Sequence, residues 1–406
     1  MNKHIHDFLR GCKRIVKAPF KIREIAKSKK KKGIILNKKR AKERSNIKIG
    51  FIVQMPEVWD KEAPLFEALI RDNRFDVFLI IVPHYDFYRS KLSQYGAEKQ
   101  YFTKKYPDVN TVLLKNENDM VIDDSYDYIF YQRCWEQYLP KQLRCKNVIN
   151  YAMTCYIPYC YHCTPMHVSY YENSFFWYLN KFYSCSEDQL NQVNEIGNIE
   201  CQYLGFPVID SLHYSFSSRN KINILWTPRW TDDQSLGGTS FNDNKYKVLE
   251  LLNQSKRISL YLRPHPLTFE NAIKQKWMSE EEVQEYKKLV VESGAFFDSN
   301  ELIEDTFVNT DILITDFTSA ILTYFLSGRP IIYCAGRDFA MTETFQEIID
   351  SLYIAQDWNE VQGCITELIN GNDPLASKRQ LVISKISNNE SSIERITEDL
   401  YMSLDD

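Results

Sequence analysis

The 406-residue sequence contains few glycines, 13 in all, and they do not form a recognised nucleotide-binding loop. Neither Gly-x-Gly-x-x-Gly, the turn that binds a dinucleotide, nor Gly-x-x-x-x-Gly-Lys-Ser/Thr, the loop that holds nucleotide phosphates, occurs in it. The absence of both patterns argues against a dehydrogenase and against a P-loop enzyme.

Long hydrophobic segments are also missing from the sequence. No apolar run approaches the roughly 18 residues that span a bilayer. The first thirty residues lack the apolar centre of a signal peptide. We therefore expect the body of the protein to be soluble and cytoplasmic.

The ten cysteines are scattered, as in proteins of a reducing compartment, and do not predict a disulfide framework in a chain of this size. One group, Cys155, Cys160 and Cys163, includes a Cys-x-x-Cys spacing that is typical of zinc sites. His162 and His167 lie beside it. A second Cys-x-x-Cys is missing, so we expect buried thiols here, with no metal and no cofactor.

Positive charge is concentrated at the N-terminus. Residues 1–48 hold 18 Lys or Arg against three acidic residues, a net charge of +15, which leaves −19 for the remainder. Apolar residues recur at helical spacing over 5–16, and Pro19 is expected to interrupt the helix before the lysine cluster at 27–32. Such an arm fits the anionic face of a membrane, where each basic residue contributes about 1 kcal/mol.

The alternative for this arm is a disordered, solvated tail. Nucleic-acid binding is not expected, because the arm has no interleaved aromatic platform and the rest of the chain is acidic.

Short apolar runs alternate with amphipathic segments through the first half of the chain, a pattern typical of a doubly wound α/β domain. The strand candidates are residues 47–53, 77–82, 111–114, 128–131 and 148–151. The pattern breaks at 205–210, a polar stretch at 215–220 follows as a linker, and a second series begins at 222–226.

This organisation predicts a GT-B-like α/β fold, in which two Rossmann-type domains face each other across a cleft where an activated donor meets an acceptor. We expect four parts. They are a basic amphipathic arm over 1–46, an acceptor domain over 47–204, a donor domain over 205–385, and a helix over 386–406 that packs back on the acceptor domain.

A polar turn follows the apolar run at 258–262. Arg263 adds a fixed cation and His265 a titratable imidazole just beyond the expected strand. Together they are expected to neutralise a pyrophosphate. The alternative interpretation of Arg-Pro-His-Pro is an ordinary rigid turn.

A second polar turn follows the run at 311–315 and leads through a helical segment into another strand, a compact βαβ unit. Thr318 and Ser319 stand at the expected helix N-cap, where hydroxyls and free backbone N–H groups favour an anion. Asp316 is expected to brace the turn. Ordinary capping is the alternative, but two such turns in one α/β half would project their polar groups over the same sheet edge.

The segments 224–230, 262–266, 311–319 and 328–333 resemble the CDP-glycerol glycerophosphotransferases of teichoic acid and capsule synthesis. The resemblance covers mainly residues 204–335. It implies a GT-B enzyme on the inner face of the bacterial membrane. Such an enzyme moves glycerol phosphate from CDP-glycerol to a hydroxyl of a membrane-linked polymer and releases CMP.

The resemblance also assigns roles to individual residues. His265 matches the family's histidine at the donor pyrophosphate, and Arg263 flanks it. Thr318 and Ser319 match the phosphate-binding turn. Arg229, displaced from the family's position, is expected to supply a phosphate-binding charge as well.

One family feature is missing, the His-Gly pair whose histidine activates the acceptor hydroxyl. His167 and His162 are the candidates for that role. The departure leaves two alternatives, a GT-B glycosyltransferase that uses a nucleotide sugar and a catalytically idle, membrane-docked scaffold. It also leaves the acceptor open, and the choice between glycerol and ribitol in the donor.

Overall fold

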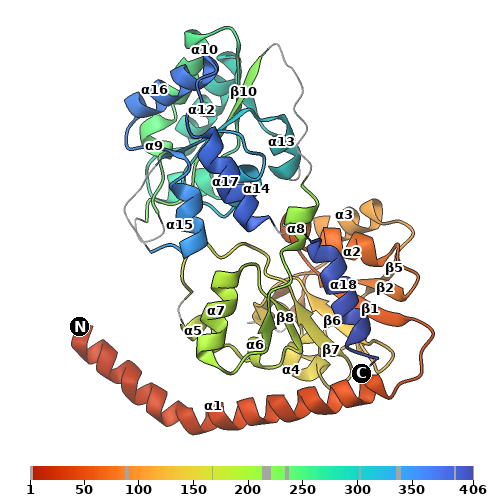
Figure 1. The fold of residues 1–406 in the computed structure, drawn as a ribbon. Coiled ribbons are helices and arrows are strands. Elements are labelled where there is room, and N and C mark those ends of the chain that lie inside the picture. The colour runs from red at the N-terminus through yellow and green to blue at the C-terminus, as the bar shows by residue number, and fades with distance from the viewer. Residues whose placement is uncertain are drawn as a thin grey trace. The chain divides into compact units, whose positions relative to one another are not determined.

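The chain folds into two compact units (Figure 1). The computed structural model describes residues 3–86, 91–166, 168–212, 221–233, 237–300, 303–334, 340–387 and 390–405. Unit 1 comprises Met1–Cys160, Met166–Asp210 and Glu390–Asp406, and unit 2 comprises Tyr161–Pro165 and Ser211–Asn389. The expected linker at 215–220 lies outside the described residues.

Unit 1 is built on a parallel sheet with the strand order β5-β2-β1-β6-β7-β8-β9. Its strands are β1 (Ile47–Val53), β2 (Phe75–Ile81), β5 (Asn110–Leu113), β6 (Tyr128–Tyr131), β7 (Met153–Tyr156), β8 (Lys181–Tyr183) and β9 (Cys201–Gln202). Every residue of β6 and β7 is buried, as expected for central strands that are covered on both faces. A short antiparallel pair, β3 (Tyr85–Asp86) and β4 (Lys91–Leu92), lies apart from this sheet.

Helices cover this sheet. The α-helices of unit 1 are α1 (Lys3–Arg40), α2 (Ala63–Leu69), α3 (Ala97–Lys105), α4 (Cys145–Val148), α5 (Val168–Tyr171), α6 (Ser174–Trp177), α7 (Glu187–Ile196), α8 (Pro207–Asp210) and α18 (Ser392–Met402). The 3-10 helices are η1 (Pro56–Lys61), η2 (Glu136–Tyr138) and η3 (Lys141–Leu143). The C-terminal helix α18 contacts α2 and α8, and the Tyr128 hydroxyl donates to the carbonyl oxygen of Leu400 at 2.8 Å.

One predicted strand of unit 1 is wrong. Residues expected to form a strand at 148–151 instead end the short helix α4 and continue into a turn, in which Tyr151 N donates to Val148 O at 2.8 Å. The strand begins later, at Met153. A short apolar run has too few residues to show whether its period is helical or extended.

The basic arm forms the single helix α1, which continues through position 19, where the sequence predicted an interruption. Its C-terminal half is fixed by unit 1. Glu24 accepts hydrogen bonds from Lys146 at 2.6 Å and Lys27 at 2.9 Å, and these cations lower the pKa of its carboxyl to about 2. Lys39 is fully buried and donates to Asp124 O at 2.8 Å. Tertiary contacts, rather than local preference, therefore fix this half of the helix.

Unit 2 is built on a second parallel sheet with the order β12-β11-β10-β13-β14-β15. Its strands are β10 (Ile222–Thr227), β11 (Ile258–Leu262), β12 (Phe296–Phe297), β13 (Ile312–Thr315), β14 (Ile331–Cys334) and β15 (Tyr353–Ala355). Its helices are α9 (Phe241–Asn244), η5 (Lys247–Glu250), α10 (Leu251–Gln254), α11 (Thr268–Lys274), α12 (Glu280–Glu292), α13 (Ile303–Asn309), α14 (Ala320–Phe325), α15 (Glu343–Ile349), α16 (Trp358–Ile369) and α17 (Ala376–Ile386). The predicted βαβ unit is confirmed as β13, α14 and β14.

Glu62, between η1 and α2, is a buried carboxyl group in unit 1. Its side chain is 1% exposed, and neither carboxylate oxygen has a hydrogen-bond partner among the described residues. Burial disfavours the charged form and raises the pKa of Glu62 to about 8. The group is therefore protonated at neutral pH in the folded protein.

We expect Glu62 to make folding pH-dependent. Between about pH 4.5 and 8 the unfolded chain loses this proton while the folded chain keeps it, so the free energy of unfolding falls as the pH rises. Glu62→Gln removes this titration. The stability of the variant relative to wild type should increase from pH 5 to pH 8 by on the order of 3 kcal/mol, measured by urea unfolding. Glu195→Gln, at an exposed site of the same unit, is the control. A stability difference between Glu62→Gln and wild type that does not change with pH would contradict this prediction.

Candidate active site

The strand order of unit 2 reverses between β10 and β13, since the chain builds outward from β10 to β11 on one side and from β13 to β14 on the other. Ligands of open α/β sheets bind outside the carboxyl ends of the strands at such a point. Thr227 and Thr315 are register partners at these two ends, and their Oγ1 atoms lie 2.8 Å apart. This hydrogen bond joins the two strand ends where a ligand is expected.

Asp316 directly follows β13 and binds the loop after β10. Its buried carboxylate oxygen Oδ2 accepts hydrogen bonds from Arg229 N at 2.7 Å and Ser240 N at 3.0 Å, and from Thr239 Oγ1 at 3.1 Å. Burial raises the pKa of Asp316, and these donors oppose the shift. Asp316 thus fixes the backbone on which Arg229 is carried.

Sequence reasoning missed Thr239 and Ser240. Both follow Gly237 and Gly238, whose φ angles of 96° and 65° lie in the left-handed region that glycine adopts without strain. The Gly-Gly pair was the available signal for a tight turn at this edge.

Arg229 lies at the edge of the site, half-buried. Its Nη1 donates to Phe317 O at 2.8 Å, and its guanidinium carbon lies 5.3 Å from the centre of the Phe317 ring. Burial lowers the pKa of Arg229, with Asp316 as the largest opposing charge. The residue therefore places a cation beside the turn between β13 and α14.

His265 joins Arg229 at this edge. Its Nδ1 accepts a hydrogen bond from Leu267 N at 3.2 Å, so in the neutral ring the proton is on Nε2. Partial burial and the Arg229 charge lower the pKa of His265 below its ordinary value of 6.5. The ring centre lies 6.0 Å from that of Trp230. His265 is thus a neutral donor at neutral pH, with Arg229 near enough to affect it.

Arg263 has a different environment. Its Nη1 forms an ion pair with the carboxylate of Asp298 and donates to Asn300 O at 2.8 Å. Asp298 also accepts a hydrogen bond from Thr306 Oγ1 at 2.6 Å. These contacts neutralise the Arg263 charge and anchor the segment after β12, so the structure gives this residue a structural partner in place of a free cation.

Thr318 and Ser319 lie at the start of α14. Thr318 Oγ1 accepts a hydrogen bond from Ala320 N at 3.3 Å, whereas the Ser319 side chain does not cap the helix. In the described part of the chain the Ser319 hydroxyl has no hydrogen-bond partner, and it is half-buried. Its hydroxyl therefore remains available to a ligand.

Of the two candidates for the acceptor base, the structure describes only His162. His167 lies outside the described residues. His162 is 6% exposed and lies in the segment Tyr161–Pro165, which is part of unit 2. There Thr342 Oγ1 donates to His162 O at 3.2 Å. Its expected place in the first domain is therefore wrong. Burial lowers the pKa of His162 to about 4.

No group of three His, Cys, Asp or Glu side chains within the described ranges is arranged to hold a metal ion. Cys155 and Cys163 are buried thiols, and burial raises the pKa of Cys155 above its ordinary range.

Comparison with protein families places these residues in a known context. Residues 211–341 match the family model described as CDP-Glycerol:Poly(glycerophosphate) glycerophosphotransferase, which confirms the resemblance seen in the sequence. The chain is a glycerophosphotransferase-like transferase. All the residues described at this edge of unit 2, from Arg229 to Ser319, fall within the matched segment. No curated protein sequence matches the chain.

Solved structures share the fold of this glycerophosphotransferase-like protein. The wall teichoic acid polymerase TagF is 15% identical over 98% of this chain and 97% of that chain, with a TM-score of 0.54. A UDP-GlcNAc 2-epimerase from Neisseria meningitidis, bound to UDP-GlcNAc, is 13% identical over 88% of this chain and 100% of that chain, with a TM-score of 0.54. Anabaena Alr3699/HepE, in complex with UDP and glucose, is 14% identical over 88% of this chain and 100% of that chain, with a TM-score of 0.51. The predicted GT-B-like fold class is confirmed.

The contrast between the two arginines of the transferase can be tested directly. Arg229→Gln removes the cation that lowers the pKa of His265, so we expect that pKa to rise toward 6.5. Arg263→Gln is the matched control and should leave it unchanged, because Arg263 is paired with Asp298. NMR titration of the His265 ring, assigned with His265→Ala, measures both. Equal shifts in the two variants would show that the paired arginine also acts on the ring.

Proposed function

We propose that this protein transfers a polyol phosphate, glycerol phosphate before ribitol phosphate, from a CDP-activated donor to a hydroxyl of a membrane-linked teichoic-acid-like or capsule polymer, and releases CMP. The observation that carries the proposal is the gathering of Arg229, His265 and the Thr318–Ser319 turn at the switch point of unit 2, inside the segment that matches the family. A solved structure of a TagF variant soaked with CDPG supports the donor class.

The proposed chemistry is in-line attack of the acceptor hydroxyl on the β-phosphate of the donor. His265 Nε2–H donates to a phosphate oxygen and stabilises the charge that develops on the departing CMP. Arg229 and the N–H groups that begin α14 hold the pyrophosphate, with the Ser319 hydroxyl as a further donor. Arg263 contributes by holding the loop after β11. Side chains and backbone dipoles supply the positive field, so we propose that no metal takes part.

We further propose that α1 holds the enzyme on the anionic inner face of the cell membrane. Its solvent-facing side combines exposed apolar residues, Phe20 (67%), Ile22 (68%) and Ile34 (58%), with exposed basic residues such as Lys27 and Lys30. Basic and apolar groups on one helix surface favour binding in the membrane interface. Among the described residues, no helix is both long enough and apolar enough to cross a membrane.

Nucleotide release tests this function. Purified protein, CDP-glycerol and a membrane extract that supplies acceptors should yield CMP in a buffer with EDTA. His265→Ala should lower kcat by about 100-fold or more without loss of folding, because it removes a donor that acts on the transition state. Lys288→Ala, at an exposed position of α12, is the control.

Other outcomes would replace the proposal. Release of a nucleoside diphosphate from a nucleotide sugar would make the protein a glycosyltransferase. Donor binding without turnover would favour the idle scaffold. Full turnover by a folded His265→Ala variant would remove His265 from the mechanism.

A further inference from the structure

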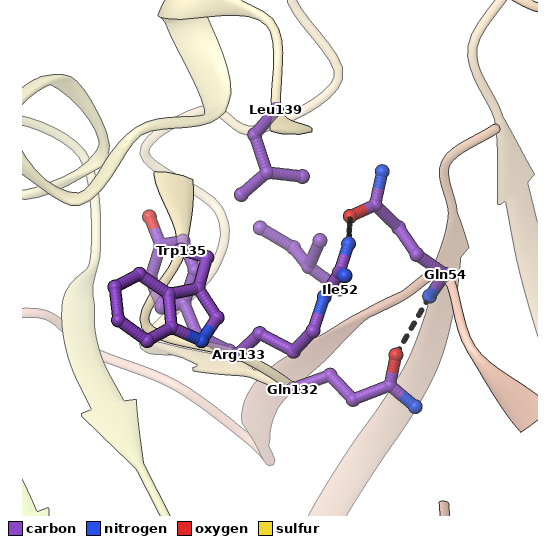
Figure 2. A pocket seen from close by; sticks show the side chains of 7 residues that line it. Ile52, Gln54, Gln132, Arg133, Trp135 and Leu139 are labelled. Atoms are coloured by element: carbon purple, nitrogen blue, oxygen red, sulfur yellow. Dashed lines mark hydrogen bonds between the residues drawn. The ribbon is translucent and has the colours of Figure 1, made fainter. Parts of the chain in front are cut away.

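Unit 1 has a switch point of its own, and a pocket lies at it. The strand order reverses between β1 and β6, which pair in parallel at the centre of the sheet. The pocket lies where these two strands end (Figure 2). Its lining residues are Ile52, Gln54, Tyr131, Gln132, Arg133, Trp135 and Leu139. A parallel sheet of this kind is expected to bind a ligand here.

Arg133 supplies the charge of this pocket. Its Nη2 donates to Gln54 Oε1 at 2.7 Å, and its guanidinium carbon lies 5.1 Å from the centre of the Tyr138 ring. No carboxylate of the described residues forms an ion pair with it. Arg133 is half-buried, and its other guanidinium nitrogens make no hydrogen bond with the described residues. The Glu57 charge acts on Arg133 through space but does not form an ion pair with it. A half-buried guanidinium without an ion-pair partner gains most from an anionic ligand.

The polar groups around Arg133 are already used by the backbone. Gln132 Oε1 accepts from Gln54 N at 2.9 Å and Met55 N at 2.8 Å. The Gln54 amide nitrogen donates to Pro83 O at 3.1 Å and Tyr138 O at 2.9 Å. These bonds fix the side chains of Gln54 and Gln132. Gln54 in turn holds the Arg133 guanidinium in place.

An aromatic wall completes the pocket. Figure 2 shows the Trp135 indole beside the Arg133 side chain, on the side away from Gln54. The indole is 36% exposed, and its Nε1 donates to the Tyr159 hydroxyl at 3.3 Å. An oriented, accessible indole offers an apolar face to the C–H groups of a polyol or sugar, while the guanidinium faces an anion.

We propose that the Arg133 pocket is a phosphate subsite for the acceptor, and that it holds a phosphate ester of a polyol or sugar with Trp135 against the carbon chain. The proposal rests on the transferase function proposed above. The donor pyrophosphate is assigned to unit 2, whereas this second anion site is complete within unit 1. A polymer that carries repeated phosphate groups offers such an anion close to the hydroxyl that reacts.

Binding of glycerol 3-phosphate tests the subsite directly. Isothermal titration calorimetry is done on the full chain with the donor site filled by CDP. Wild type should bind glycerol 3-phosphate and not glycerol. Arg133→Gln should weaken binding by about tenfold or more, because a charge-assisted fork of donors is lost. Arg71→Gln, an exposed arginine of the same unit, should bind as wild type does.

The variant Arg133→Lys distinguishes a loss of binding from a loss of folding. It keeps the charge but loses the planar fork, so binding intermediate between wild type and Arg133→Gln is expected. Binding by Arg133→Gln equal to that of wild type, or no binding by wild type, would overturn the subsite.

The acceptor assignment has a separate readout. In the CMP-release assay, Arg133→Gln should raise the KM for the acceptor by about tenfold and leave the KM for CDP-glycerol unchanged. A raised donor KM alone would overturn the assignment. Arg133-dependent binding to phosphatidylglycerol vesicles, but not to phosphatidylcholine vesicles, would assign the pocket to a lipid headgroup and also overturn it. Failure of CMP release with Arg133-dependent binding intact would count against the proposed function and leave the anion site standing.

Discussion

The buried carboxylate of Asp316 is the interaction on which the candidate active site depends. Removing a charge from water costs several kcal/mol unless hydrogen bonds replace the lost hydration. Here one oxygen accepts from two backbone N–H groups and a hydroxyl, all in the segment that follows β10. The ends of β10 and β13 are thereby joined by these three hydrogen bonds as well as by the Thr227–Thr315 hydrogen bond. The hydrogen bond from its backbone N–H fixes the position of Arg229, and the charge of Arg229 in turn lowers the pKa of His265.

The two sheets share one feature of strand order that creates a ligand site. In each, the chain builds outward in both directions from a central pair of parallel strands, so the loops at their carboxyl ends diverge and leave room for a ligand. In unit 2, Arg229 and His265 lie together at this edge, and in unit 1 Arg133 lines a pocket there. A reaction between two phosphate-bearing substrates needs a cationic site for each.

Much of the fold followed from the sequence, because its signals are local. The β13–α14–β14 unit was evident from a change of hydrophobic period. Several features that the sequence did not show depend on distant partners. The pairing of Arg263 with Asp298 spans 35 residues, and the passage of α1 through position 19 accompanies contacts with unit 1. Arg133 belongs to no recognised sequence motif, and its position at the switch point of unit 1 follows from the strand order.

The most direct test of the central claim is a crystal structure of the protein with CDP-glycerol. The account predicts the donor pyrophosphate at the carboxyl ends of β10 and β13, with a phosphate oxygen within hydrogen-bond distance of His265 Nε2 and a second contact to Arg229. A pyrophosphate bound in the Arg133 pocket, or held by Arg263 with His265 turned away, would contradict it.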